Sequence, residues 1–210
     1  VTDQEQIVTS NRLDYIVNED MRLLGRFNHS KTDDNLASRA EAKFTEAQVG
    51  LAYRPVANDR LNLLAKYTYL YDLRGLEQVD TNTDQRSNIF SVEGIYRLTP
   101  RWDIGGKYAY RKGELRTGRN RGEWFDSTTS FFAVRGRYHV IRRWDALLEY
   151  RWLDVNEAGS TRDGWLIALD RHINDHLKVG VGYNFTDFSD DLTDLDYEHK
   201  GWFINAVGKY

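Results

Sequence analysis

The stretch Arg101-Trp102-Asp103-Ile104-Gly105-Gly106-Lys107-Tyr108-Ala109-Tyr110-Arg111 alternates between two kinds of side chain. Apolar or aromatic residues and one glycine stand at the even positions, and every charged residue stands at an odd position. Successive side chains of a β-strand point to opposite faces of a sheet, so this period of two predicts a strand with one apolar and one ionic face. Rows of the same kind recur at 61–71 and 177–185.

The alternation continues along most of the chain and predicts eleven strands with no helices between them. They are expected at 7–18, 20–29, 42–54, 59–72, 87–98, 101–115, 126–140, 143–155, 162–173, 176–187 and 200–210. Many alternating segments of about ten residues are what a transmembrane β-barrel needs. The predicted fold class is therefore all-β: an antiparallel up-and-down transmembrane barrel.

The connections between these strands alternate in length. Short connections are expected near 18–20, 55–59, 99–100, 141–142 and 174–175, and long ones near 30–41, 74–86, 116–124, 156–161 and 189–200. Bacterial outer-membrane barrels have the same asymmetry, with tight periplasmic turns and longer extracellular loops. The pattern therefore predicts the bacterial outer membrane as the location.

The composition excludes several classes of protein. The 210 residues include no cysteine, so neither a disulfide framework nor a thiolate metal site is available. The net charge of −3 gives no basic field for nucleic acid. No run approaches the roughly 18 apolar residues of a membrane helix, but a barrel strand escapes that criterion because only its alternate residues meet lipid.

The strand count bears on how complete the barrel is. We expect residues 1–210 to form a single barrel domain, with no visible signal peptide, as a mature form, an excised domain or the C-terminal part of a longer chain. Bacterial single-chain barrels usually have an even number of strands. About twelve strands are therefore expected, with one missing before residue 7 or one split or merged; ten strands, or a chain that completes a larger barrel, are the alternatives.

Charged side chains of both signs lie opposite the apolar rows. In a membrane barrel they point into the lumen, where opposite charges pair across neighbouring strands. The residues expected to face the lumen are Lys66, Glu93, Arg97, Asp103, Lys107, Arg111, Arg135, Arg137, Asp145, Glu149, Arg151, Asp170 and Lys178. The alternative is the solvated face of a soluble β-protein, and alternation alone does not separate the two.

Aromatic residues gather at both ends of the apolar rows, which favours the membrane barrel. Near the short turns are Tyr96, Trp102, Tyr138, Trp144 and Tyr210. Toward the long connections are Tyr110, Trp152, Trp165 and Trp202. Two such girdles are typical of the two membrane interfaces.

The last strand alternates and ends on an aromatic residue, through Trp202, Ile204, Ala206, Gly208 and Tyr210. It resembles the signal by which bacterial outer-membrane barrels are recognised by their assembly machinery, and 179–185 with 202–210 is similar to the closing hairpin of such proteins. Residues 182–191 and the ending 208–210 also resemble the C-terminal barrels of large multidomain bacterial surface proteins. The resemblance implies that the barrel-assembly machinery is a partner, through the C-terminal strand.

Few residues indicate chemistry. The loop 187–198 is rich in carboxylates, the donors that calcium prefers, and its candidate ligands are Asp187, Asp190, Asp191 and Asp194. The alternative is an acidic loop that keeps the surface soluble or bridges lipopolysaccharide through divalent ions. His29-Ser30 lacks the third partner that a serine hydrolase needs. We therefore predict no enzymatic activity, no cofactor and no nucleic-acid partner.

Two functions fit these features best. The first is a membrane anchor or scaffold of a surface assembly, in contact with outer-membrane lipid, lipopolysaccharide and other surface or periplasmic subunits. The second is a porin-like channel for small charged solutes. A barrel of this size has a narrow interior, so long side chains such as Arg135 and Arg151 favour low conductance and the anchor. An outer-membrane enzyme and a soluble β-protein rank below both.

Overall fold

The computed structural model describes residues 3–36, 39–73, 83–118, 122–141, 143–174, 176–188, 192 and 200–208. Across these residues the chain forms eleven β-strands. Among them there is no helix that is long and apolar enough to cross a membrane. The strands are β1 (Gln4–Ile16), β2 (Met21–Asp34), β3 (Arg39–Tyr53), β4 (Leu61–Leu73), β5 (Thr83–Thr99), β6 (Trp102–Thr117), β7 (Trp124–Ile141), β8 (Trp144–Val155), β9 (Ser160–His172), β10 (Leu177–Asn184) and β11 (Gly201–Gly208).

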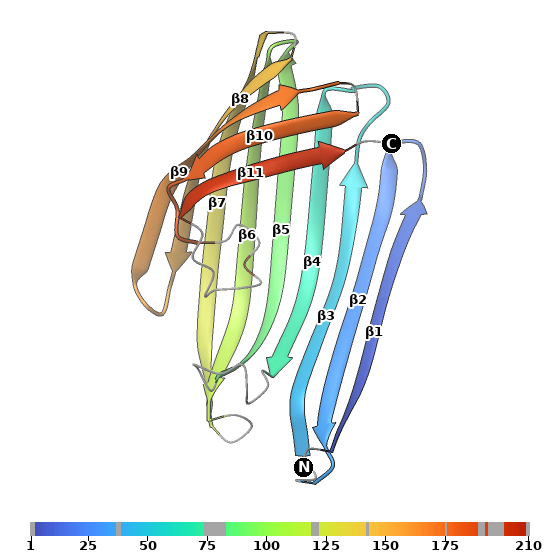
Figure 1. Ribbon diagram of the computed structural model, residues 1–210, viewed down its shortest axis with the longest axis vertical. Coiled ribbons are helices and arrows are strands. Elements are labelled where there is room, and N and C mark those ends of the chain that lie inside the picture. Colours follow the sequence, from blue (N-terminus) through green and yellow to red (C-terminus); the bar gives the residue numbers. More distant parts are fainter. Residues whose placement is uncertain are drawn as a thin grey trace.

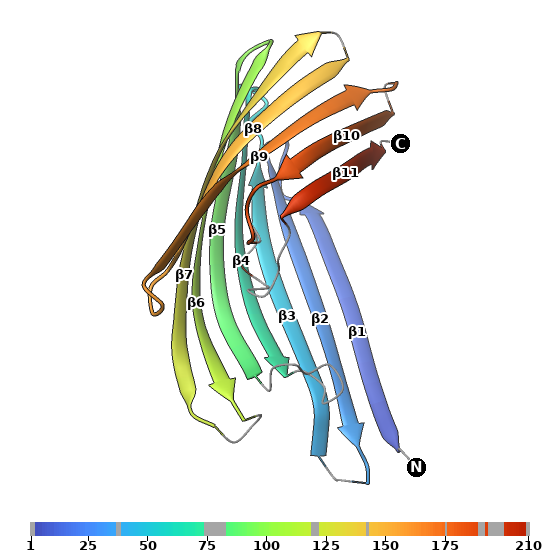
Figure 2. The same ribbon diagram turned by 60° about the vertical axis from the view of Figure 1, so that its left-hand side comes forward.

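All strands belong to one antiparallel sheet in which spatial order follows chain order. The sheet curves strongly (Figure 1). In Figure 2, β8 to β11 rise to the right and β1 to β3 rise to the left, so the last strands cross the direction of the first. The ends of the chain lie at opposite ends of the sheet: the N-terminus at the end of the longer connections and the C-terminus at the end of the short turns (Figure 1). The predicted antiparallel up-and-down architecture is confirmed.

All eleven predicted strands are present, but several extend further toward the long connections than predicted. β2 continues to Asp34 and β5 begins at Thr83. As a result, two connections that we expected to be long, β2–β3 and β8–β9, are only 35–38 and 156–159. The predicted strands ended where the apolar alternation ended. Backbone pairing continues past that point, between the polar ends of the hairpin strands.

The two faces of the sheet differ in chemistry. The outward face carries apolar side chains that are about half exposed, among them Val134 at 47% and Leu148 at 48%. The concave face carries buried charged side chains, including Lys107, Arg111, Asp145 and Glu149. A continuous apolar surface outside and ionic groups inside is the arrangement expected in lipid rather than in water.

The sheet remains open between its first and last strands. Within the described residues, β1 pairs only with β2, and β11 pairs only with β10. The twelfth strand anticipated from the sequence does not occur among these residues. Both edge strands run from the end of the long connections to the end of the short turns, so the described residues form a sheet with an odd number of strands.

Adjacent leucines on β8 test the orientation of the sheet. Leu148 points outward, and Leu147 faces inward as the cross-strand partner of Arg137. Leu148→Glu should destabilise the protein in bilayers by about 1–2 kcal/mol, because its charge meets lipid. Leu147→Glu, the matched control, should cost much less because the new carboxylate faces a guanidinium. Urea unfolding in lipid vesicles measures both, and equal costs would contradict the assignment of faces.

Candidate functional site

At the short-turn end, the concave face carries a histidine–aspartate cluster. Asp145 accepts from both sides: its Oδ1 lies 2.6 Å from Nδ1 of His139 and its Oδ2 lies 2.9 Å from Nε2 of His172. The other ring nitrogen of His139 lies 3.3 Å from Asp103. Asp145 lies at the start of β8, beside the irregular pairing at the end of β7. From this position its carboxylate contacts His139 on β7 and His172 on β9. Among the described residues, no group of three or more histidine, cysteine, aspartate or glutamate side chains is arranged to hold a metal ion.

A belt of arginine–glutamate pairs crosses the middle of the concave face. Arg135 lies 3.2 Å from Glu93 and 2.9 Å from Glu149, and Arg151 lies 2.5 Å from the second oxygen of Glu149. Glu149 is only 3% exposed, and two guanidinium groups compensate its buried charge. Gly105 leaves room for this arrangement, because a Cβ atom there would come within 2.9 Å of the Arg135 side chain.

Toward the long connections, the concave face carries an apolar cluster. Phe131, Leu153, Ile89 and two alanines form a buried cluster, and Phe188 and Leu192 from the β10–β11 connection pack onto it. The rings of Phe131 and Phe188 meet edge to face, with their centroids 6.2 Å apart. Phe188 and Leu192 therefore cover part of the concave face.

Arg111 is fully buried next to this cluster. Its guanidinium donates to Gln85 Oε1 at 3.1 Å and to Ser127 Oγ at 3.4 Å, and no described carboxylate lies within ion-pair distance. The guanidinium lies over the backbone of Gly113, where an added Cβ would come within 2.8 Å of its central carbon. Glycine is therefore needed at position 113 to accommodate Arg111.

On the rest of the concave face, some cations have no ion-pair partner among the described residues. Arg12 and Arg26 are cross-strand partners, which places two like charges side by side on β1 and β2. Several concave-face cations have no ion pair within the described residues: Arg12, Arg22, Arg26, Lys66 and Arg137. The carboxylates of β5, β6, β8 and β9 on this face, by contrast, all have a basic partner.

Every charged residue that the sequence assigned to the lumen lies on the concave face, by the register of the strands. The structure brings Glu93, Arg135, Glu149 and Arg151 together, and pairs Lys178 with Asp170 at 2.8 Å. Their role in lining a pore stays a prediction. Sequence reasoning missed the inward contacts of Phe188 and Leu192, because a connection has no periodicity from which to read a face.

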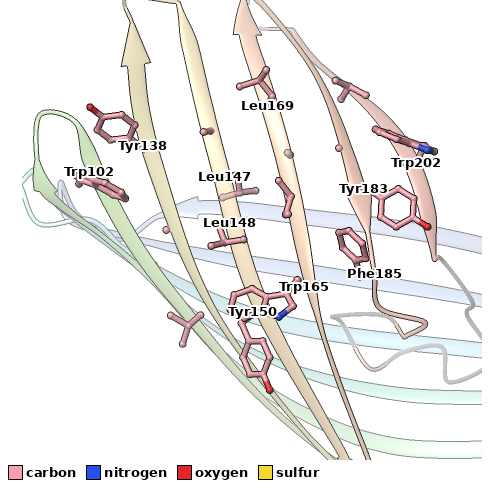
Figure 3. Close-up of a pocket in the computed structure, with 17 residues that line it drawn as sticks. Trp102, Tyr138, Leu147, Leu148, Tyr150, Trp165, Leu169, Tyr183, Phe185 and Trp202 are labelled. Atoms are coloured by element: carbon pink, nitrogen blue, oxygen red, sulfur yellow. The ribbon is translucent and has the colours of Figure 1, made fainter.

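The predicted girdle residues lie on the outward face, except Tyr210, which is outside the described residues. Trp102 packs on Tyr138 with ring centroids 4.6 Å apart, and Trp165 packs on Tyr150 at 4.8 Å. Figure 3 shows these four side chains around an apolar groove of about 780 Å³ that extends from β6 to β11. The groove lies on the surface that faces lipid in a barrel.

The calcium candidate falls almost wholly outside the described residues, since only Asp187 of its four carboxylates is described. Asp187 is half exposed and lies 3.5 Å from Arg162. Calcium binding by this loop therefore stays a prediction.

Comparisons with known proteins show the fold. Neither a protein-family model nor a curated protein matches the chain. Among solved structures, the siderophore receptor PirA from Pseudomonas aeruginosa is 11% identical over 85% of this chain and 32% of its own, with a TM-score of 0.58. The NanC porin is 11% identical over 99% of this chain and 93% of its own, with a TM-score of 0.53.

A Pseudomonas aeruginosa FadL homologue also aligns, at 14% identity over 99% of this chain and 66% of its own, with a TM-score of 0.51. The chain thus spans about a third of the siderophore receptor, but nearly the whole of the porin. It has the fold of a bacterial outer-membrane β-barrel, as the sequence predicted. The predicted location in the outer membrane agrees with this fold.

Gly113 provides a test of the buried arginine. Gly113→Ala should displace the Arg111 guanidinium and lower the free energy of unfolding by about 1–3 kcal/mol, as overpacking usually does. Gly136→Ala is the control, because a Cβ there meets nothing within 4 Å, and it should change stability by less than about 0.5 kcal/mol. Denaturant unfolding measures both. Equal stability of the two variants would contradict the described packing.

Proposed function

We propose that this chain is a non-conducting β-barrel that serves as the outer-membrane anchor of a surface assembly. The observation that carries the proposal is the packing of Phe188 and Leu192, from the β10–β11 connection, onto the apolar cluster of the concave face. Once the sheet is closed into a barrel, this cluster lies in the lumen. The lumen is then obstructed by the protein's own residues.

The apolar cluster opposes the passage of water and ions. An ion next to Phe131, Leu153 and Phe188 meets apolar side chains that cannot replace its hydration shell. Hydrophobic constrictions in channels stop conduction because they lose their water. Leu192 is only 1% exposed and Phe188 only 5%, so both side chains are packed against the sheet.

The arginine–glutamate belt lies closer to the short turns than the apolar cluster and provides a second obstruction. Arg135 and Arg151 extend across the concave face and are each held by Glu149, so their charges are already neutralised by the protein. A barrel of about twelve strands is narrow enough for such side chains to fill much of it. An ion or solute entering from the short-turn end would have to displace these pairs.

A barrel that does not conduct still provides a stable attachment to the membrane. Its partners under this proposal are the ones expected from the sequence: outer-membrane lipid and lipopolysaccharide, other surface or periplasmic subunits, and the assembly machinery through the C-terminal strand. The absence of enzymatic activity stays a prediction from the sequence.

Conductance tests the proposal. In planar bilayers the refolded protein should show no steady current steps, and the double variant Phe188→Ala/Leu192→Ala should produce them because the apolar packing is lost. Phe185→Ala is the matched control: it changes the same residue type in the same connection, but this side chain lies on the outward face, 49% exposed. It should remain silent. Large, steady steps from the unmodified protein would refute the anchor.

A second candidate function, a channel for small anionic solutes, is favoured by the surplus of unpaired cations. Arg12, Arg22 and Arg26 line the concave face of the first two strands, where no carboxylate of the described residues forms an ion pair with them. Rings of arginine and lysine select anions in pores. This candidate therefore refines the predicted porin-like channel for charged solutes.

Ion selectivity tests the second candidate. If the unmodified protein conducts, its reversal potential in a roughly tenfold KCl gradient should show selectivity for chloride. Arg12→Glu/Arg26→Glu should shift that potential toward potassium, because it reverses the charge of the wall. The same change at Arg101, which is exposed in a short turn, should have little effect. A cation-selective unmodified pore would exclude this candidate.

A further inference from the structure

The two edges of the sheet are exposed in a way that indicates a missing neighbour. Outward side chains in the middle of the sheet are about half exposed, as Val134 is at 47%, whereas Ile204 on β11 is 80% exposed. On β1, both the outward Leu13 and the inward Val8 are exposed. The edge strands thus lack lateral contacts that every inner strand has.

The direction of the edges excludes direct closure by antiparallel pairing. β1 and β11 both run from the long-connection end to the short-turn end, so joining them would give a parallel pair in an otherwise antiparallel sheet. A second copy of residues 1–210 does not solve the problem. When both copies insert into the membrane in the same orientation, all of their edge strands run in the same direction. Every pairing between the two copies is therefore also parallel.

An open edge is unstable in the membrane. The unpaired N–H and C=O groups of β1 and β11 would face hydrocarbon, where no water satisfies them, and for this reason spanning barrels are closed. We propose that one further strand, running from the short-turn end to the long-connection end, lies between β1 and β11 and closes the barrel. We assign this strand to the polypeptide segment that leads directly into β1.

Strand length favours this segment over other sources. β1 offers 13 residues for pairing and β11 only 8. A strand that precedes β1 forms a local hairpin with the longer edge, at a low entropic cost of loop closure, and has the required direction. The backbone N–H of Asn35 already bonds to the carbonyl of Asp3, so the chain stays in line with the sheet ahead of Gln4.

The edges also specify the chemistry of the strand. Its outward positions adjoin Leu13, Tyr15 and Trp202 and should be apolar or aromatic. Its inward position beside Arg12 should carry a carboxylate, because the other neighbour of Arg12 across the sheet is Arg26. A conducting and a non-conducting barrel both need this strand, because both have to be closed in the membrane.

Cysteine pairs test the closure, since the chain has no cysteine of its own. The protein is expressed from its own gene and analysed in outer membranes. Leu13→Cys is combined in turn with Trp202→Cys, Ile204→Cys and Ala206→Cys. The control pair Leu13→Cys/Gly25→Cys joins cross-strand partners and should form a disulfide on oxidation. The edge pairs should not, because one intervening strand separates them by about 10 Å, and a thiol reagent of that length should join at least one of them.

The source of the strand is identified in the same membranes. A photo-crosslinking phenylalanine analogue replaces Tyr15, and the linked peptide is sequenced by mass spectrometry. A peptide from the segment ahead of residue 1 is the expected result. A peptide from β11, from beyond residue 210 or from another protein would overturn the assignment. A direct disulfide between the edges, or no link with the 10-Å reagent, would overturn the closure itself.

Discussion

Hydrocarbon offers no hydrogen-bond partners, and this constraint determines most of what the chain does. Backbone groups within the membrane have to pair with one another, so the chain spans it with a continuous antiparallel ladder. Side chains that meet lipid have to be apolar, and the period of two along each strand then places the ionic residues that alternate with them on the opposite face. One physical requirement therefore produces the alternation, the outward apolar surface and the charged concave face.

Once ionic groups are enclosed, they have to satisfy one another. Glu149 is buried between Arg135 and Arg151, and Asp145 between His139 and His172. Loss of one partner would leave a buried charge uncompensated, which is strongly destabilising. These ion pairs therefore hold neighbouring strands together on the concave face. The first strands lack this mutual compensation, and their arginines are the part of the concave face available to a charged ligand or to a further strand.

Much of the fold could be predicted from the sequence, because lipid and backbone pairing impose a pattern that repeats in every strand. Asp103, Lys107 and Arg111 could be assigned to one face from their odd positions alone. The site was less predictable. No pattern marked Phe188 and Leu192 as inward-facing, because connections lack a period. The strand ends near Asp34 and Thr83 were missed because, outside the apolar zone, only backbone pairing defines them. Closure of the barrel depends on the pairing of edges, which a residue pattern does not encode.

The most direct test of the account is the environment of each residue along one strand in a bilayer. Spin labels on single cysteines at positions 145 to 152 of β8 can be probed with oxygen, which concentrates in lipid, and with a water-soluble nickel complex. The account predicts that oxygen accessibility alternates with a period of two and peaks at Ala146, Leu148, Tyr150 and Trp152. High oxygen accessibility at Asp145, Leu147, Glu149 and Arg151, or no alternation, would contradict it.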